Sequence, residues 1–236
     1  MKRTHDFLYL KEIRKDNPKE YFKFLADNFK RDSKRKKHLD ILDIGCATGE
    51  FIYFMRKEFP ENNYIGMDIL PELLDVAQQN NPEQEFIKYN INSSDSLLNS
   101  KFDFIFMSGV HSIFDETEVW IENLSTLLKN DGEIYLFGIF NPENLDVIIK
   151  SRTSNSDEEW ETGWNLFSIE TIRKQFDKKN FVCEVLPWNI NIDIHKSSED
   201  PLRSWTMLCK DNNRIIVNGL QLIHHFYLIK IKKGTE

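Results

Sequence analysis

A carboxylate and two spaced glycines mark one turn of this sequence as a candidate ligand site. The segment "LDILDIGCATGEF", residues 39–51, is an apolar run that reaches Asp43 and continues through Gly45 and Gly49. A dinucleotide-binding turn has the pattern G-x-G-x-x-G, which lets a pyrophosphate approach the backbone and a helix N-terminus. Here the third glycine is missing, and Asp43 would repel a phosphate. The turn therefore favours a ligand that carries positive charge and no phosphate.

The segments around this turn alternate between strand-like and helix-like patterns. Apolar runs predict strands, and apolar residues at helical spacing predict helices. Predicted strands cover 38–45, 63–69, 85–91, 102–110 and 133–140, and predicted helices cover 49–59, 71–80 and 116–132. This order predicts a parallel sheet with helices on both faces. Ligands of such sheets bind at the carboxyl ends of the strands, where the glycine turn lies.

The two ends of the chain depart from this alternation. We predict two short N-terminal helices, separated at an Asn-Pro pair. In the last third we predict one helix and three strands, the last of them antiparallel with one partly exposed face. Residues 141–165 fit no regular element, and such a long irregular segment is usually functional or mobile. The terminal helices are predicted over 5–16, 19–31 and 168–180, and the strands over 181–194, 214–219 and 224–233.

The segment "LDIGCATGEF" resembles the first motif of the class I S-adenosylmethionine-dependent methyltransferases, a seven-stranded Rossmann-like family. The ligand agrees with the turn, because S-adenosylmethionine carries an ammonium and a sulfonium but no phosphate. The resemblance implies S-adenosyl-L-homocysteine as the product. It also implies that the methionine part of the cofactor contacts Asp43, Ile44, Gly45, Cys46 and Gly49. On the residues alone, the glycines could simply permit tight turns and Cys46 could be a small core residue.

The implied fold is α/β, a doubly wound, seven-stranded, mostly parallel sheet whose last strand is antiparallel, with helices on both faces. We predict a helical N-terminal cap over residues 1–37 that covers the cofactor, and a methyltransferase domain over 38–236. Within that domain, residues 38–140 would form the cofactor half. Residues 141–236 would shape the acceptor pocket.

Later strands carry further likenesses to the family. The resemblance implies that Asp68, followed by Ile69, accepts hydrogen bonds from the ribose hydroxyls of the cofactor. It implies that Asn90 meets the adenine amino group, with Ile91 against the ring. The segment "FDFIFMSGVHSIFD" is similar to the family's fourth-strand segment, which places the Met107 backbone near the cofactor. Asp68 could instead be a helix cap before the following proline.

The same fourth-strand likeness places residues 108–113 at the methyl-transfer face, which makes His111 the leading candidate base. A neutral hydroxyl acceptor needs its proton removed, usually by a histidine or a carboxylate. This sequence is one residue shorter than the family there, so His111 could instead only pack or orient the loop. The paired histidines before the final strand point to opposite faces of a strand, so at most one of them can reach the site.

Substrate selection is expected from segments outside the cofactor half. Arginines with tryptophans could hold an anionic or sugar-like acceptor. The tail "DPLRSWTM…RIIVNGLQLIHHFYLIKIK" is similar to bacterial methyltransferases of surface-polysaccharide biosynthesis, which implies O-methylation of a sugar or a phosphate-type group. The predicted substrate-binding residues are Asn141, Arg152, Trp164, Arg203 and His225.

Composition excludes several other classes of protein. The 236 residues carry a net charge of −7 and have a pI near 5.5, which argues against a general nucleic-acid binder. No apolar run approaches the length of a membrane span, and no signal peptide opens the chain, so we expect a cytoplasmic protein with no membrane partner. Three cysteines without C-x-x-C spacing predict no disulfide and no zinc site. We find no metal-ligand spacing and expect a metal-independent enzyme with a small-molecule substrate.

Two alternatives stay open. One is a tRNA or protein methyltransferase that docks its substrate on the basic run at residues 30–37. Base-amino methylation is disfavoured, because "MSGV" stands where such enzymes carry "NPPY" or "DPPY". The other is a non-catalytic regulator that binds S-adenosylmethionine without turnover. A nucleotide-dependent oxidoreductase is disfavoured by the missing third glycine.

Overall fold

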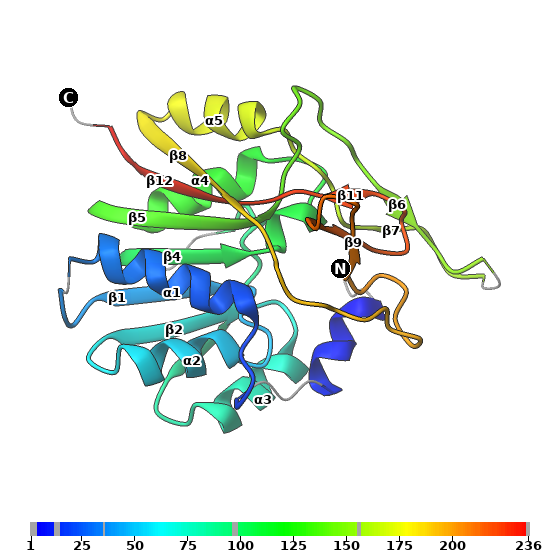
Figure 1. The fold of residues 1–236 in the computed structure, drawn as a ribbon. Helices are drawn as coiled ribbons and strands as arrows, with labels where there is room; N and C mark the ends of the chain where they lie inside the picture. Colours follow the sequence, from blue (N-terminus) through cyan, green and yellow to red (C-terminus); the bar gives the residue numbers. More distant parts are fainter. Residues whose placement is uncertain (1–3, 12–14, 35, 96–98, 155–156, 235–236) are drawn as a thin grey trace.

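One seven-stranded sheet forms the centre of the computed structural model, which describes residues 4–11, 15–34, 36–95, 99–154 and 157–234 (Figure 1). The strand order is β3-β2-β1-β4-β5-β12-β8, and β12 is antiparallel to both of its neighbours while the other strands are parallel. The predicted fold class is therefore confirmed. The strands are β1 (Asp40–Ile44), β2 (Asn63–Asp68), β3 (Glu85–Lys88), β4 (Phe102–Ser108), β5 (Leu128–Ile139), β8 (Phe181–Trp188) and β12 (Phe226–Lys233).

Helices cover both faces of this sheet. Phe104 and Phe106 of β4 pack with α1 and α2, whereas the intervening Ile105 packs with α4 and α5. This alternation follows from the two-residue period of a strand, which sends successive side chains to opposite faces. The helices are η1 (Thr4–Lys11), α1 (Glu20–Asp32), α2 (Glu50–Glu58), α3 (Pro71–Asn80), η2 (Val110–Ile113), α4 (Glu118–Leu127) and α5 (Ile169–Asp177).

The N-terminal segment divides between two roles. α1 buries Phe22, Leu25 and Phe29 in one core cluster with residues of the sheet. The division into an N-terminal cap over 1–37 and a domain over 38–236 stays a prediction. η1 is a short 3-10 helix and lies beside the cofactor half of the sheet, where it contacts α3. Residues 12–14 of the first predicted helix lie outside the described residues.

Three expectations about local structure were wrong. The helix predicted over 116–132 ends at Leu127, because Leu128 already pairs with Phe102 as the start of β5. The final strand has no exposed face along its centre, since β12 lies between β5 and β8 and buries Lys230. The sequence analysis predicted only part of a second, three-stranded sheet, because the short strands of this sheet form by pairing with one another and have little pattern of their own. It comprises β9 (Trp205–Leu208), β10 (Arg214–Val217) and β11 (Ile223–His224).

In the described residues of the irregular segment at 141–165, β6 (Lys150–Ser151) and β7 (Glu161–Thr162) form a two-stranded ribbon. The strand order reverses between β1 and β4, which makes their carboxyl ends the expected ligand position of an open α/β sheet. None of the helices in the described ranges is both long and apolar enough to cross a membrane.

Candidate cofactor and acceptor site

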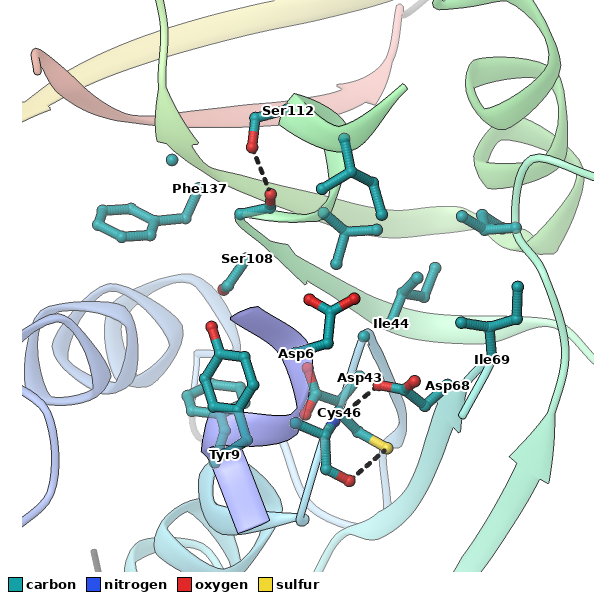
Figure 2. Close-up of a pocket in the computed structure, with 18 of the residues that line it drawn as sticks. Asp6, Tyr9, Asp43, Ile44, Cys46, Asp68, Ile69, Ser108, Ser112 and Phe137 are labelled. Carbon is teal, nitrogen blue, oxygen red and sulfur yellow. Dashed lines mark hydrogen bonds between the residues drawn. The ribbon is translucent and has the colours of Figure 1, made fainter. Parts of the chain in front are cut away.

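A cavity of about 590 Å³ opens at the carboxyl ends of β1, β2, β4 and β5 (Figure 2). The sheet order divides its walls into two parts. The cofactor half follows β1, β2 and β3, and the acceptor half follows β4 and β5 and includes Phe226 at the start of β12. Residues of the cofactor half include Asp43, Ile44, Gly45, Cys46, Asp68, Ile69, Asn90 and Ile91, and those of the acceptor half include Ser108, Ser112, Asp115, Phe137, Thr162, Trp164, Ser204 and Phe226.

The glycine turn is built by backbone geometry. Gly45 has a φ of +72°, and its N–H donates to the Met67 carbonyl at 2.7 Å. A Cβ at Gly45 would lie 2.1 Å from Val110 Cγ2, so the missing side chain lets the loop after β4 close over the turn. Gly49 does not line the cavity among the described residues. It approaches α3, where a Cβ would lie 3.1 Å from the Ala77 Cβ.

Two buried acids dominate the cofactor half. Asp43 is 5% exposed, and burial, with the nearby charge of Asp68, raises its pKa to about 8. Burial also raises the pKa of Asp68, against hydrogen bonds from the backbone N–H groups of Leu70 and Ala47 at 3.0 and 2.9 Å. A cationic ligand would relieve the cost of ionising these groups. The two carboxyl groups of Asp43 and Asp68 therefore fit the ammonium and sulfonium of S-adenosylmethionine.

Other predicted cofactor residues lie at different depths. Ile69, Asn90 and Ile91 line the cavity beside Asp68. Met107 is fully buried in the sheet and is not among the described residues that line the cavity. The next residue, Ser108, does line it. Figure 2 shows Ser112 and Phe137 at one end of the view and Asp43 and Asp68 toward the other, with Asp6 of η1 between them.

His111 does not reach the cavity. Its ring is fully buried, stacks on Phe140 at 4.3 Å, and places Nε2 3.0 Å from the Ile139 carbonyl. Burial lowers the pKa of His111 to about 4, so the ring is neutral at pH 7 and Nε2–H donates to the carbonyl. A Cβ at Gly138 would lie 2.4 Å from His111 Cε1. His111 thus lies outside the described lining and packs between the loop after β4 and the end of β5, and its role as a base stays a prediction.

Of the predicted substrate residues, Trp164 alone is among the described residues that line the cavity. The Asn141 amide donates to the Leu145 carbonyl at 2.8 Å, and Arg152 stacks on Trp160 at 4.9 Å. Arg203 does not line the cavity. His225 is exposed beside a second, smaller cavity of about 160 Å³. These four residues therefore do not converge on one acceptor site.

The segment 108–113, predicted at the methyl-transfer face, contributes Ser108, Gly109, Val110, Ser112 and Ile113 to the lining, but sequence reasoning missed other residues of the acceptor half. Asp115 ends the quoted segment "FDFIFMSGVHSIFD", but the likeness to the family drew attention to His111 instead. Phe137 and Phe226 were indistinguishable from core residues by pattern. Thr162 and Ser204 lie in segments with no recognisable periodicity. Within the described ranges, no group of three or more His, Cys, Asp or Glu side chains is arranged to hold a metal ion.

Comparisons with known proteins agree with this geometry. Residues 42–134 match the family described as "Methyltransferase domain". A malonyl-[acyl-carrier protein] O-methyltransferase of Acetivibrio thermocellus is 28% identical over 156 residues, which cover 64% of this chain and 54% of that protein. The chain spans about half the length of the first curated relatives it matches.

Solved structures share the fold. A S-adenosylmethionine-dependent methyltransferase from Clostridium acetobutylicum superposes with a TM-score of 0.61 and 16% identity, over 98% of both chains. The magnesium protoporphyrin IX methyltransferase of Synechocystis, solved with bound S-adenosylhomocysteine, has a TM-score of 0.60 and 12% identity, over 98% of this chain and 95% of that one. Residues 42–134 of this chain are therefore similar to a methyltransferase domain, and the chain shares its fold with solved S-adenosylmethionine-dependent methyltransferases.

Proposed function

We propose that this chain transfers a methyl group from S-adenosylmethionine to a small-molecule acceptor, at oxygen. The observation that carries the proposal is one continuous cavity whose two halves differ in chemistry. The cofactor half places the buried carboxyls of Asp43 and Asp68 at the turn after β1 and the end of β2. The acceptor half adjoins it with aromatic and hydroxyl side chains, of which Phe137 and Ser108 are examples.

The chain's own residues supply binding, orientation and exclusion of water. When bound, S-adenosylmethionine supplies an electrophilic methyl group on a sulfonium. Asp43 and Asp68 would hold its cationic and ribose parts, and Asn90 with Ile91 would hold the adenine. The loop from Ser108 to Asp115 would wall the side on which the acceptor enters. Alignment of acceptor and methyl group is a large part of the acceleration of such a displacement.

Oxygen as the methylated atom is supported by the printed activity of the first relatives, which are O-methyltransferases. The polysaccharide-type acceptor gains no support from the cavity. Arg152 and Arg203, which were predicted to hold an anionic sugar, do not line it among the described residues. The proposed acceptor is therefore a small molecule, and a sugar acceptor is the less supported form of the proposal.

The two alternatives differ in what the structure offers them. The basic run precedes Asp40 at the amino end of β1, whereas the cavity lies at the carboxyl ends of the strands (Figure 1). Lys37 is already paired with Glu61 at 2.6 Å, and Arg35 lies outside the described residues. A tRNA or protein docked on this run would have to extend around the domain to reach the cavity. A non-catalytic regulator would bind the cofactor and leave the acceptor half unused.

The experiment is methyl transfer from methyl-labelled S-adenosylmethionine into a lysate of the source organism, separated by molecular size. We expect label in the small-molecule fraction with the native chain. An Asp43→Asn/Asp68→Asn variant is the matched control and should transfer none. Label in RNA or protein that is lost in a Lys34→Glu/Lys36→Glu/Lys37→Glu variant would favour the docking alternative. Cofactor binding without label in any fraction would favour the regulator.

A further inference from the structure

We propose that the acceptor is a ring-bearing compound that presents a hydroxyl group to Asp115, and that it is not a carboxylate. This inference rests on the proposed function and names the substrate class of the same cavity. Asp115 follows η2 in the loop after β4 and lines the acceptor half. Among the described residues of that half, Asp115 is the one carboxylate. The described wall of the whole cavity also includes one lysine, Lys19, which lies 4.9 Å from the centre of the Tyr9 ring, and four further acids, Asp6, Asp43, Glu50 and Asp68.

One oxygen of Asp115 is held and the other is available. Oδ1 accepts hydrogen bonds from Thr162 Oγ1 at 2.5 Å and from Asn165 Nδ2 at 3.1 Å. Oδ2 lies 3.7 Å from Lys150 Nζ, which is beyond hydrogen-bond distance. Within the described parts of the chain, Oδ2 therefore keeps its capacity to accept a hydrogen bond from an acceptor.

The carboxylate is ionised and fixed in place. The hydrogen bond from Thr162 has the largest effect on the pKa of Asp115 and lowers it. Burial has the next largest effect and raises this pKa, while Asn165 and Lys150 lower it further. Thr162 and Asn165 are themselves buried, so the loop after β4 is tied to the segment around β7. A side chain held by two neighbours can orient a hydroxyl group at low entropic cost.

The remaining wall suits an apolar ring. Phe137 stacks on Tyr21 with centroids 5.0 Å apart and on Phe226 at 5.8 Å, and all three line the cavity. Trp164 lines it as well. Aromatic walls of this kind favour flat, apolar bodies through offset stacking. The hydroxyl groups of Ser108, Ser112 and Ser204 are neutral polar contacts and add no positive charge.

A carboxylate acceptor would meet the wrong charge here. Like charges at close range disfavour one another, and a partly enclosed site screens them less than water does. Lys150 pairs with Asp115 at 3.7 Å, but the two side chains are 55% and 42% exposed, so the pair is weak, and Lys150 is not among the described residues that line the cavity. The relatives named for a malonyl acceptor therefore share the cofactor domain with this chain, while the acceptor wall points to another substrate class.

The test uses three probes built on the same methyl-substituted ring: 4-methylphenol, 4-methylanisole, which lacks the donor, and 4-methylbenzoate, which is anionic. Each is titrated by NMR into the complex of the chain with S-adenosylhomocysteine, and the binding of S-adenosylhomocysteine is measured first by calorimetry. We expect 4-methylphenol to bind about tenfold tighter than either other probe, because it alone donates a hydrogen bond to a charged group.

In Asp115→Asn, which keeps the oxygen that Thr162 and Asn165 hold, this preference should disappear and 4-methylbenzoate should gain affinity. Lys150→Gln is the matched control and should weaken 4-methylbenzoate further.

The outcomes separate the two proposals. Failure of S-adenosylhomocysteine to bind the native chain overturns the proposed function, and this inference with it. If it binds, tightest binding of 4-methylbenzoate overturns the inference alone. An unchanged order of the probes in Asp115→Asn, with native thermal stability, also overturns it, because Asp115 would then be only a tie between loops. Binding of none of the three probes overturns the ring-bearing class.

Discussion

Asp32 at the end of α1 and Lys230 in the middle of β12 form an ion pair of 2.7 Å between that helix and the sheet. The two side chains are 18% and 6% exposed, and the Tyr135 hydroxyl of β5 also donates to Asp32. Burial alone would raise the pKa of Asp32, but hydrogen bonds from Lys230 and Tyr135 lower it. The pair joins the N-terminal helix to the C-terminal strand, so it fixes two segments that both contribute to the cavity wall.

Removing one partner of this pair should destabilise the domain. In Lys230→Met, Asp32 loses its cation in a poorly hydrated position, and we expect the free energy of unfolding to fall by about 2–4 kcal/mol. Lys23→Met is the control, because Lys23 pairs with Glu20 on the exposed side of α1 at 2.6 Å and should cost less than about 1 kcal/mol. Urea denaturation checks both. The double variant Asp32→Asn/Lys230→Met should recover part of the loss, and equal losses for Lys230→Met and Lys23→Met would contradict the argument.

Cofactor binding should release a proton from Asp43. Its pKa is raised to about 8 by burial and by Asp68, so at pH 7 the carboxyl is mostly protonated in the empty cavity. A bound ammonium favours the ionised form and lowers that pKa. Affinity for S-adenosylhomocysteine should therefore rise with pH and level off above about pH 8.

Calorimetry at pH 7 in buffers of different ionisation enthalpy checks the proton release from Asp43. In Asp43→Asn the affinity should be lower, and the pH dependence due to this group should be absent. An equal number of protons released by the native chain and by Asp43→Asn would show that another group titrates.

Local patterns were enough to predict the first strands of the sheet and the ligand turn after β1, whereas the roles of the cofactor residues came from the family resemblance and stay predictions. Strands β1, β2 and β4 are rich in apolar residues because both of their faces are covered, and such a strand is visible without knowledge of the fold. Asp43 and Asp68 follow directly, since each lies at the end of such a strand. The parallel pairing of β1 with β2 then brings these acids together whatever the details of the loops are.

Features that depend on distant partners were not predictable in this way. Lys230 alternates with apolar residues and suggested an exposed face, but it is buried because Asp32 from the other end of the chain pairs with it. Asp115 resembles any loop aspartate until Thr162 and Asn165 are placed beside it. His111 matched a family position, yet the loop turns its ring into the core against Phe140.

His111 should prove to be a positioning residue. His111→Phe keeps an aromatic ring on Phe140 and removes the hydrogen bond to the Ile139 carbonyl, so we expect stability to fall by about 1–2 kcal/mol. Once the acceptor is known, kcat at pH 7 should change by less than about tenfold, whereas loss of a general base typically costs about a hundredfold or more. The pH profile of kcat should keep its shape. A hundredfold loss of kcat in a variant of native stability would restore His111 as the base.

Gly45 and Gly109 allow the cost of a clash to be separated from the cost of backbone strain. Both have positive φ, +72° and +78°, but a Cβ at Gly45 meets Val110 Cγ2 at 2.1 Å and one at Gly109 has nothing within 4 Å. Gly109→Ala should therefore cost only about 1 kcal/mol of strain. Gly45→Ala should cost more than Gly109→Ala and weaken S-adenosylhomocysteine binding as well, because it displaces the loop after β4.

The double variant Gly45→Ala/Val110→Ala removes the Cγ2 atom that clashes and should regain most of the difference in thermal stability between the two single variants. Val110→Ala alone is the reference for the methyl groups lost from the loop. If Gly45→Ala and Gly109→Ala proved equally stable, the close approach of Val110 to the turn would not be what requires a glycine there. Backbone conformation would then be the whole reason for Gly45, and the loop after β4 would owe its position over the cofactor half to its own contacts with β5.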